Sequence, residues 1–196
     1  IDQLTVGRQP DSDLVLDDDL NRAETEALLR LAGRMRRSPL RHRNALAGRV
    51  LALLFEKPSL RTRVTFEVAM KTLGGDSVFV DCRGERIAER EPVADVARNL
   101  DRWVDGIAAR TFDHSTVEEL ARWSSVPVIN ALSDRAHPCQ ALADMLTLQG
   151  AIGRLDGLKL AFVGDGNNVA HSLLLTGAKL GVHVAVATPP SYEPDP

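Results

Sequence analysis

Residues 55–67, FEKPSLRTRVTFE, combine basic and hydroxyl side chains directly after an apolar run. The apolar run predicts a buried strand, and the apolar spacing that follows it predicts a helix. A helix start presents free N–H groups and partial positive charge, which bind phosphate well, and arginine can hold phosphate bidentately. The alternative is an exposed helix start with a serine cap and solvated arginines. Under the first interpretation the side chains that contact the anion are Ser59, Arg61 and Thr62.

Three further polar side chains stand at or after other candidate strands. Arg110 ends the apolar segment GIAAR, and His137 and Gln140 belong to HPCQ, which follows VPVINAL. In open α/β sheets ligands bind beyond the carboxyl ends of the strands, so these side chains are expected near the anion site. His137 can donate to a carbonyl oxygen, and Gln140 can pair with an amide-like group. For His137 alone, a helix-cap histidine is the simpler interpretation.

The segment 164–172, GDGNNVAHS, has the form of a strand–turn–helix connection. It lacks the third glycine of a dinucleotide fingerprint, and no acidic residue stands out ~20 residues further on. Asn167 and Asn168 are either turn and cap residues, or one of them faces a cleft between two domains and binds a polar substrate.

Strand and helix patterns alternate along the chain and predict an α/β fold, a doubly wound parallel sheet with flanking helices. The lead-in at residues 1–19 is predicted to be extended or a loop, and the helix at 115–124 is predicted to open with a capping box from Ser115 or Thr116. The strands are expected at 49–56, 76–81, 106–112 and 126–132, and the main helices at 20–37, 59–75, 90–104, 115–124 and 137–153.

A glycine-rich stretch near residues 149–155 predicts a domain boundary. Residues 1–150 then form one domain, and residues 151–196 form the first βαβ unit of a second, Rossmann-like domain that looks incomplete. A single βαβ unit cannot bury both faces of its sheet, so residues 158–188 are expected to fray.

Composition excludes several classes of protein. The chain has 196 residues, 44% of them hydrophobic and 26% charged, with a net charge of −3, which favours neither a nucleic-acid nor a membrane partner. No window approaches ~18 consecutive apolar residues, and the acidic start resembles no secretory or transit signal. Cys82 and Cys139 fit neither a disulfide framework nor a metal motif, so the cytoplasm is the expected compartment.

Four segments together resemble the aspartate/ornithine carbamoyltransferase family, and its ornithine branch in particular. The resemblance covers the chain from about residue 46 onward and is poor over the first 20 residues. Ser-x-Arg-Thr and His-Pro-x-Gln are shared by both branches, whereas GDGNNVAHS is more typical of the ornithine branch. The segments occur in the family's order: FEKPSLRTRVTFE, REPVADVARNLDRWVDGIAARTF, VPVINALSDRAHPCQALADMLTL and GDGNNVAHSLL.

The resemblance implies a reaction and a set of roles. Carbamoyl phosphate would donate its carbamoyl group to the side-chain amine of L-ornithine, giving L-citrulline and phosphate in arginine metabolism, without a metal or an organic cofactor. The resemblance also implies a homotrimer, or a multiple of trimers, with shared active sites. The implied phosphate contacts are Ser59, Leu60, Arg61 and Thr62, the carbamoyl contacts Arg110, His137 and Gln140, and the ornithine contact Asn168.

One position departs from the family pattern. Arg86 aligns with a loop position where the family usually has glutamine and where a neighbouring subunit contributes to the phosphate site. Arg86 is either a stronger phosphate ligand or a solvated loop charge, and the first interpretation is preferred here. The family's ornithine-binding Asp and Ser-Met-Gly segment and its His-Cys-Leu-Pro loop are not found in this sequence. Two alternatives therefore stay open: another amine acceptor (aspartate, putrescine or an acylated ornithine), or a non-catalytic, truncated phosphate-binding module.

Overall fold

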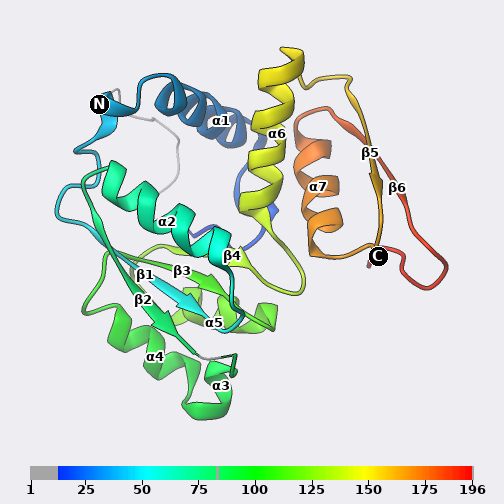
Figure 1. Ribbon diagram of the computed structural model, residues 1–196. Coiled ribbons are helices and arrows are strands. Elements are labelled where there is room, and N and C mark those ends of the chain that lie inside the picture. The colour runs from blue at the N-terminus through cyan, green and yellow to red at the C-terminus, as the bar shows by residue number, and fades with distance from the viewer. Residues whose placement is uncertain (1–12, 83, 196) are drawn as a thin grey trace.

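The computed structural model describes residues 13–82 and 84–195. Four parallel strands form the main sheet in the order β2-β1-β3-β4 (Figure 1). The predicted fold class, a parallel sheet with flanking helices, is confirmed. The strands are β1 (Val50–Phe55), β2 (Asp76–Asp81), β3 (Gly106–Arg110) and β4 (Val128–Leu132).

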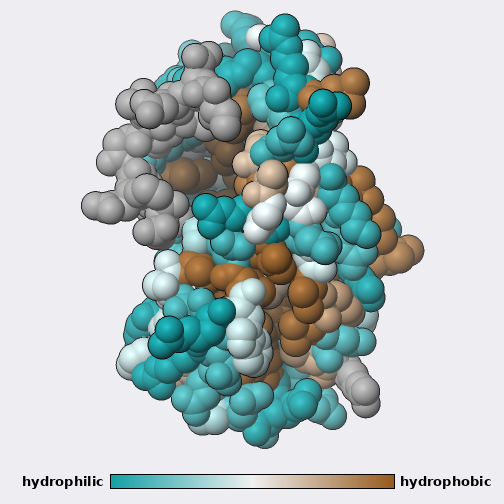
Figure 2. Space-filling view, turned by 90° about the vertical axis from the view of Figure 1, so that its left-hand side faces the viewer, coloured by the Kyte–Doolittle hydropathy of each residue, from teal (hydrophilic) through white to brown (hydrophobic). Residues whose placement is uncertain are grey.

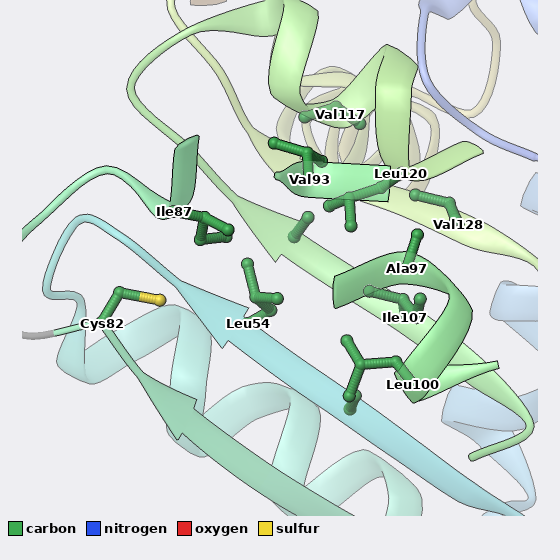
Figure 3. Packing of buried hydrophobic residues seen from close by; sticks show 12 residues of the cluster. Leu54, Cys82, Ile87, Val93, Ala97, Leu100, Ile107, Val117, Leu120 and Val128 are labelled. Carbon is green, nitrogen blue, oxygen red and sulfur yellow. The ribbon is translucent and has the colours of Figure 1, made fainter. Parts of the chain in front are cut away.

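Helices cover both faces of this sheet because alternate residues of each strand point to opposite faces. On β1, Leu51, Leu53 and Phe55 pack against α2 (Leu60–Thr72) through Phe66 and Met70. The neighbouring positions, Ala52 and Leu54, belong to the core on the other face, which Figure 3 shows from close by. Three helices cover this face: α3 (Ile87–Arg90), α4 (Val93–Leu100) and α5 (His114–Trp123).

A second hydrophobic cluster joins the remaining elements. It contains Leu29, Met145 and Leu173, and it ties two strands to three helices (Figure 1). These strands pair in parallel as a separate two-stranded sheet. One face of that sheet is exposed, at Val163 for example, whereas Leu160 and Phe162 pack against the cluster. The elements are α1 (Arg22–Arg37), α6 (Pro138–Ile152), α7 (Asn168–Lys179), β5 (Lys159–Val163) and β6 (His183–Ala187).

Two details of the sequence analysis need correction. The capping box predicted at the start of α5 is wrong: the helix begins at His114, and its N-cap Asp113 makes no side-chain cap bond. Instead Asp134, from the loop after β4, accepts the backbone N–H of His114 at 2.7 Å. The lead-in at residues 1–19 lies largely outside the described residues, but its last part is ordered. Leu14 forms a parallel bridge to Ile129, and a 3₁₀ helix, η1 (Asp17–Asp19), follows.

Candidate active site

Sheet register brings three chain segments to one edge. Phe55 on β1 is the partner of Arg110 on β3, and Arg110 is in turn the partner of Leu132 on β4. Each of these residues ends its strand. Arg110 therefore lies between the segment that enters α2 and the segment that enters α6, and its carbonyl oxygen accepts the backbone N–H of Glu56 at 2.8 Å.

The start of α2 has the serine cap that the alternative interpretation names. Ser59 is the N-cap, and its Oγ accepts the Thr62 backbone N–H at 3.3 Å and donates to Thr62 Oγ1 at 2.9 Å. Arg61 is exposed beside this cap. Arg63 is engaged elsewhere: its Nε is 2.8 Å from Glu67, and its guanidinium carbon lies 3.7 Å from the centre of a phenylalanine ring. The two arginines are thus not equivalent, and Arg61 is the better placed for an anion at the helix start.

Arg110 and His137 form the polar centre of the edge. Arg110 Nε and His137 Nδ1 are both buried without a hydrogen-bond partner among the described residues. Burial, and secondarily the charge of Arg110, lower the pKa of His137 to about 4. Burial also lowers the pKa of Arg110 below its ordinary value. A guanidinium nevertheless keeps its charge in proteins. A cation therefore stands beside a neutral imidazole.

His137 occupies the N-cap position of α6, but its side chain does not cap the helix. His137 is thus the helix-cap residue by position, as the simpler interpretation has it, but its ring makes no cap bond. Pro138 follows at the first helical position, where its missing N–H costs nothing.

The other predicted residues lie around this centre with bonds of their own. Gln140 is exposed and donates from Nε2 to Asp144 at 2.9 Å. Asn168, the first residue of α7, donates from its side-chain amide to the carbonyl oxygen of Ser133, which links α7 to the segment leading into α6. Its neighbour Asn167 is the helix cap, with Oδ1 3.0 Å from the Val169 backbone N–H.

Arg86 is paired within its own chain. Its Nε is 2.8 Å from Asp113, and its guanidinium carbon lies 5.0 Å from the centre of the Phe112 ring. Lys57 approaches the same ring, with Nζ 5.1 Å from its centre. Phe112 thus gathers two cations at the margin of the site, an arrangement that aromatic faces favour.

Glu56 is the chief residue of this region that the sequence analysis missed. Its side chain is fully buried, with 0% exposed, and each carboxylate oxygen accepts one backbone N–H. Ile87 donates to Oε1 at 2.7 Å and Phe112 donates to Oε2 at 2.7 Å. The carboxylate thereby fixes the loops that follow β2 and β3 against the end of β1. An acidic residue directly after an apolar strand was the available signal.

Metal and thiol chemistry find no support in the part of the chain that the structure describes. It contains no cluster of three or more histidine, cysteine or acidic residues arranged to hold a metal ion. Burial raises the pKa of the Cys82 thiol to about 11 and that of Cys139 to about 12, so both stay protonated at neutral pH. Among the same residues, no helix has the length and apolar character needed to cross a bilayer.

Comparison with known proteins identifies relatives of this chain. Residues 12–150 match the family model for the aspartate/ornithine carbamoyltransferase carbamoyl-P binding domain, and residues 156–196 match that for the Asp/Orn binding domain. The chain is 62% identical over 173 residues to ornithine carbamoyltransferase from Thermus thermophilus, covering 88% of this chain and 57% of the relative. It is 52% identical over 181 residues to that of Thermococcus kodakarensis, covering 91% and 57%.

Solved structures agree with these sequence matches. The crystal structure of ornithine carbamoyltransferase from Thermus thermophilus superposes with a TM-score of 0.90 at 58% identity, covering 96% of this chain and 65% of that one. The Pyrococcus furiosus enzyme gives 0.88 at 48% identity, covering 93% and 59%. The chain thus spans somewhat more than half the length of these relatives. By sequence and by structure, the chain belongs to the aspartate/ornithine carbamoyltransferase family.

Proposed function

We propose that the protein transfers the carbamoyl group of carbamoyl phosphate to the side-chain amine of L-ornithine, giving L-citrulline and phosphate. The observation that carries this proposal is the register at the sheet edge, which sets Arg110 between the start of α2 and His137. A substrate with a phosphate at one end and a carbonyl at the other fits such a row of groups. The matching family models and the names of the relatives support the same reaction.

The phosphate of the donor would bind at the start of α2. Free backbone N–H groups, including that of Leu60, and the hydroxyl of Thr62 would donate to its oxygens. Ser59 would also donate to phosphate once its hydroxyl hydrogen turns away from Thr62. Arg61 would supply a charge that no described residue already neutralises, whereas Arg63 is paired with Glu67. Binding there combines the partial charge of the helix with a bidentate guanidinium contact.

The carbamoyl group would lie against Arg110, His137 and Gln140. Attack by the amine places negative charge on the carbonyl oxygen, and fixed donors aimed at that oxygen stabilise the transition state, typically by ~3 kcal/mol each. A pKa near 4 keeps the imidazole of His137 neutral at pH 7, so it acts as a hydrogen-bond donor and not as a second cation. The C–O bond to phosphate then breaks, phosphate leaves, and the nitrogen loses a proton.

The acceptor amine must attack in its neutral form, although its pKa in water resembles that of lysine, ~10.4. Removal of water when two domains close over the site is one way to lower that pKa. Asn168 begins α7 at the same edge and is the proposed contact for the ornithine backbone groups. Its bond to Ser133 would have to be shared or exchanged when the acceptor binds. The division into domains at residues 1–150 and 151–196 is part of this proposal.

Arg86 would act on a neighbouring subunit's phosphate site in a homotrimer. Its pairing with Asp113 means that it would have to exchange that partner for phosphate. Exposed apolar side chains recur along α2 at Leu60, Val64 and Val68, and Figure 2 shows apolar residues reaching the surface on one face of the molecule. The three side chains on α2 are spaced four residues apart and so share one face of the helix, and an exposed apolar face favours subunit contact. The trimer and the cytoplasmic location stay predictions.

Titration calorimetry of the protein with carbamoyl phosphate tests the donor site. Arg61→Ala is expected to weaken binding by about 100-fold, since it removes a charge-assisted contact worth about 3 kcal/mol. Arg63→Ala is the matched control and is expected to leave affinity nearly unchanged. A folded wild-type protein that does not bind carbamoyl phosphate, or equal losses in both variants, would refute the proposed anion site.

Product analysis separates the alternatives for the acceptor. Citrulline formed from ornithine supports the proposal, whereas turnover only with aspartate, putrescine or an acylated ornithine assigns another acceptor. Donor binding without turnover of any of these amines identifies the non-catalytic phosphate-binding module.

A further inference from the structure

The segment that precedes α1 connects the main sheet to α7. Leu14 pairs with the edge of β4: its N–H donates to Val128 at 2.8 Å, and its carbonyl accepts from Asn130 at 2.8 Å. The side chain of Asn130 also donates to the carbonyl of Val15 at 2.9 Å. The chain then turns through η1 and places Asp17 against α7. A segment expected to be a lead-in thus bridges two parts of the fold.

Asp17 is a buried carboxylate, with 4% of its surface exposed. Its Oδ2 accepts from Ser172 Oγ at 2.6 Å, and its Oδ1 accepts from Thr176 Oγ1 at 2.8 Å. These two hydroxyls lie four residues apart, on one face of α7. Lys179, further along the helix, donates to the backbone carbonyls of Asp17 and Leu20. Both carboxylate oxygens therefore have a defined partner on the same helix.

The hydrogen bonds continue from Ser172 to the candidate active site. Ser172 Oγ accepts the backbone N–H of His137 at 2.9 Å. A serine hydroxyl has one hydrogen, and Ser172 donates it to Asp17. The lone pairs of Ser172 Oγ therefore stay available to accept the His137 N–H. Without Asp17 the hydroxyl is free to turn its hydrogen to a backbone carbonyl of its own helix, as serine commonly does. The carboxylate thereby sets the direction of the bond that holds His137.

We propose that Asp17 is a positioning residue: through Ser172 it holds the backbone of His137 at the start of α6 and so keeps the imidazole beside Arg110. The inference rests on the proposed function, in which His137 faces the carbamoyl group. It extends that function to a residue that does not touch the substrate and that lies 120 positions earlier in the chain.

The chemistry of the position favours this role over a purely structural one. Burial raises the pKa of Asp17, and the bonds from Ser172 and Thr176 oppose that effect only in part. A buried charge is a poor way to stabilise a helix contact, since well-packed apolar residues often serve as well or better. What an apolar residue cannot do is orient the Ser172 hydroxyl. A purely structural role therefore predicts that Asp17→Leu changes only the stability, whereas a positioning role predicts that it also disturbs His137.

The test compares Asp17→Leu, Ser172→Ala and their double variant in the whole protein, with Asp18→Asn as the control. Asp18 is the exposed neighbour of Asp17 and pairs with Lys179 at 3.2 Å. Each single variant is expected to weaken carbamoyl phosphate binding by about 3- to 10-fold, the effect of one lost hydrogen bond. The double variant is expected to lose no more than Ser172→Ala alone, because both act on one bond. Asp18→Asn is expected to change nothing.

A second readout needs no ligand. The ¹⁵N chemical shifts of the His137 ring, followed against pH, are expected to show a higher pKa in Asp17→Leu and Ser172→Ala than in the wild type, as the ring leaves its buried place beside Arg110. Unchanged ring titration together with additive losses of affinity would overturn the positioning role, as would a loss of thermal stability alone. If wild type binds no carbamoyl phosphate, the proposed function fails, yet the ring titration still decides whether Asp17 positions His137. Asp17→Ala, which removes both acceptor oxygens without adding bulk, serves if Asp17→Leu does not fold, and is expected to shift the titration in the same direction.

Discussion

Acidification from pH 7 to pH 4 is expected to destabilise the protein through His137. Burial, and then the charge of Arg110, lower the pKa of this imidazole from 6.5 to about 4 in the folded state. The unfolded chain takes up the proton near pH 6.5, whereas the folded protein takes it up only near pH 4. The stabilisation is therefore complete above pH 6.5 and is lost progressively as the pH falls to about 4.

The size of the effect follows from the shift. A shift from 6.5 to about 4 corresponds to at most about 3 kcal/mol of unfolding free energy, at about 1.4 kcal/mol per pKa unit. The ring is partly exposed, so solvent screening reduces this figure. The loss is still a large fraction of the 5–15 kcal/mol that typically holds a domain together.

Urea unfolding at pH 7 and pH 4 measures the effect when wild type is compared with His137→Gln, which replaces the imidazole with a neutral amide. Burial also lowers the pKa of His114, but His114 and the carboxylates are present in both proteins. The difference between the two losses of unfolding free energy therefore isolates His137. Wild type is expected to lose up to about 3 kcal/mol more than the variant. Equal losses, or a His137 ring that titrates near pH 6.5 by NMR, would refute the reasoning and place the imidazole in water.

Three further predictions concern the frame around the site. Glu56→Gln is expected to cost about 1–3 kcal/mol of unfolding free energy, because its amide cannot accept from both backbone N–H groups, as chemical denaturation can measure. Gly74→Ala is expected to be more destabilising than Gly84→Ala in thermal melts: both have positive φ, but a Cβ at Gly74 would lie 2.5 Å from a backbone oxygen and one at Gly84 meets nothing within 4 Å. Amide exchange is expected to be faster in residues 158–188 than in residues 50–145, because the β5–β6 sheet has only two strands; equally slow exchange would contradict the predicted fraying.

The main sheet was predictable because each of its elements carries a local signal. The apolar run before Glu56 can only be a buried strand of a parallel sheet or a short buried helix, and its length favours the strand. Gly74 has φ of +85°, a conformation that favours glycine, and α2 ends just before it, at Thr72, within the helix expected over 59–75. The common edge of Arg110 and His137 then follows from topology alone, since parallel strands end on one side.

Contacts between distant segments were not predictable in this way. Nothing local marks Asp17 as buried, because it stands in a run of acidic residues that looks solvated. Its burial depends on where Ser172 and Thr176 fall on a helix about 155 residues later. The capping box of α5 failed for the same reason: Ser115 had the right spacing, but Asp134 from another loop already binds the start of the helix.

The two substrates of the proposed reaction are not equally supported by the described residues. Four features suit an anion beside a carbonyl group. They are a helix start, the exposed guanidinium of Arg61, the partly buried guanidinium of Arg110 and the neutral imidazole of His137. For the acceptor the described residues offer one candidate contact, Asn168, whose amide is already bonded to Ser133. A single amide cannot distinguish ornithine from another amine, because discrimination needs several groups that would be left unpaired by the wrong substrate. Donor recognition can therefore be tested with variants of these residues, whereas acceptor choice has to be measured by turnover.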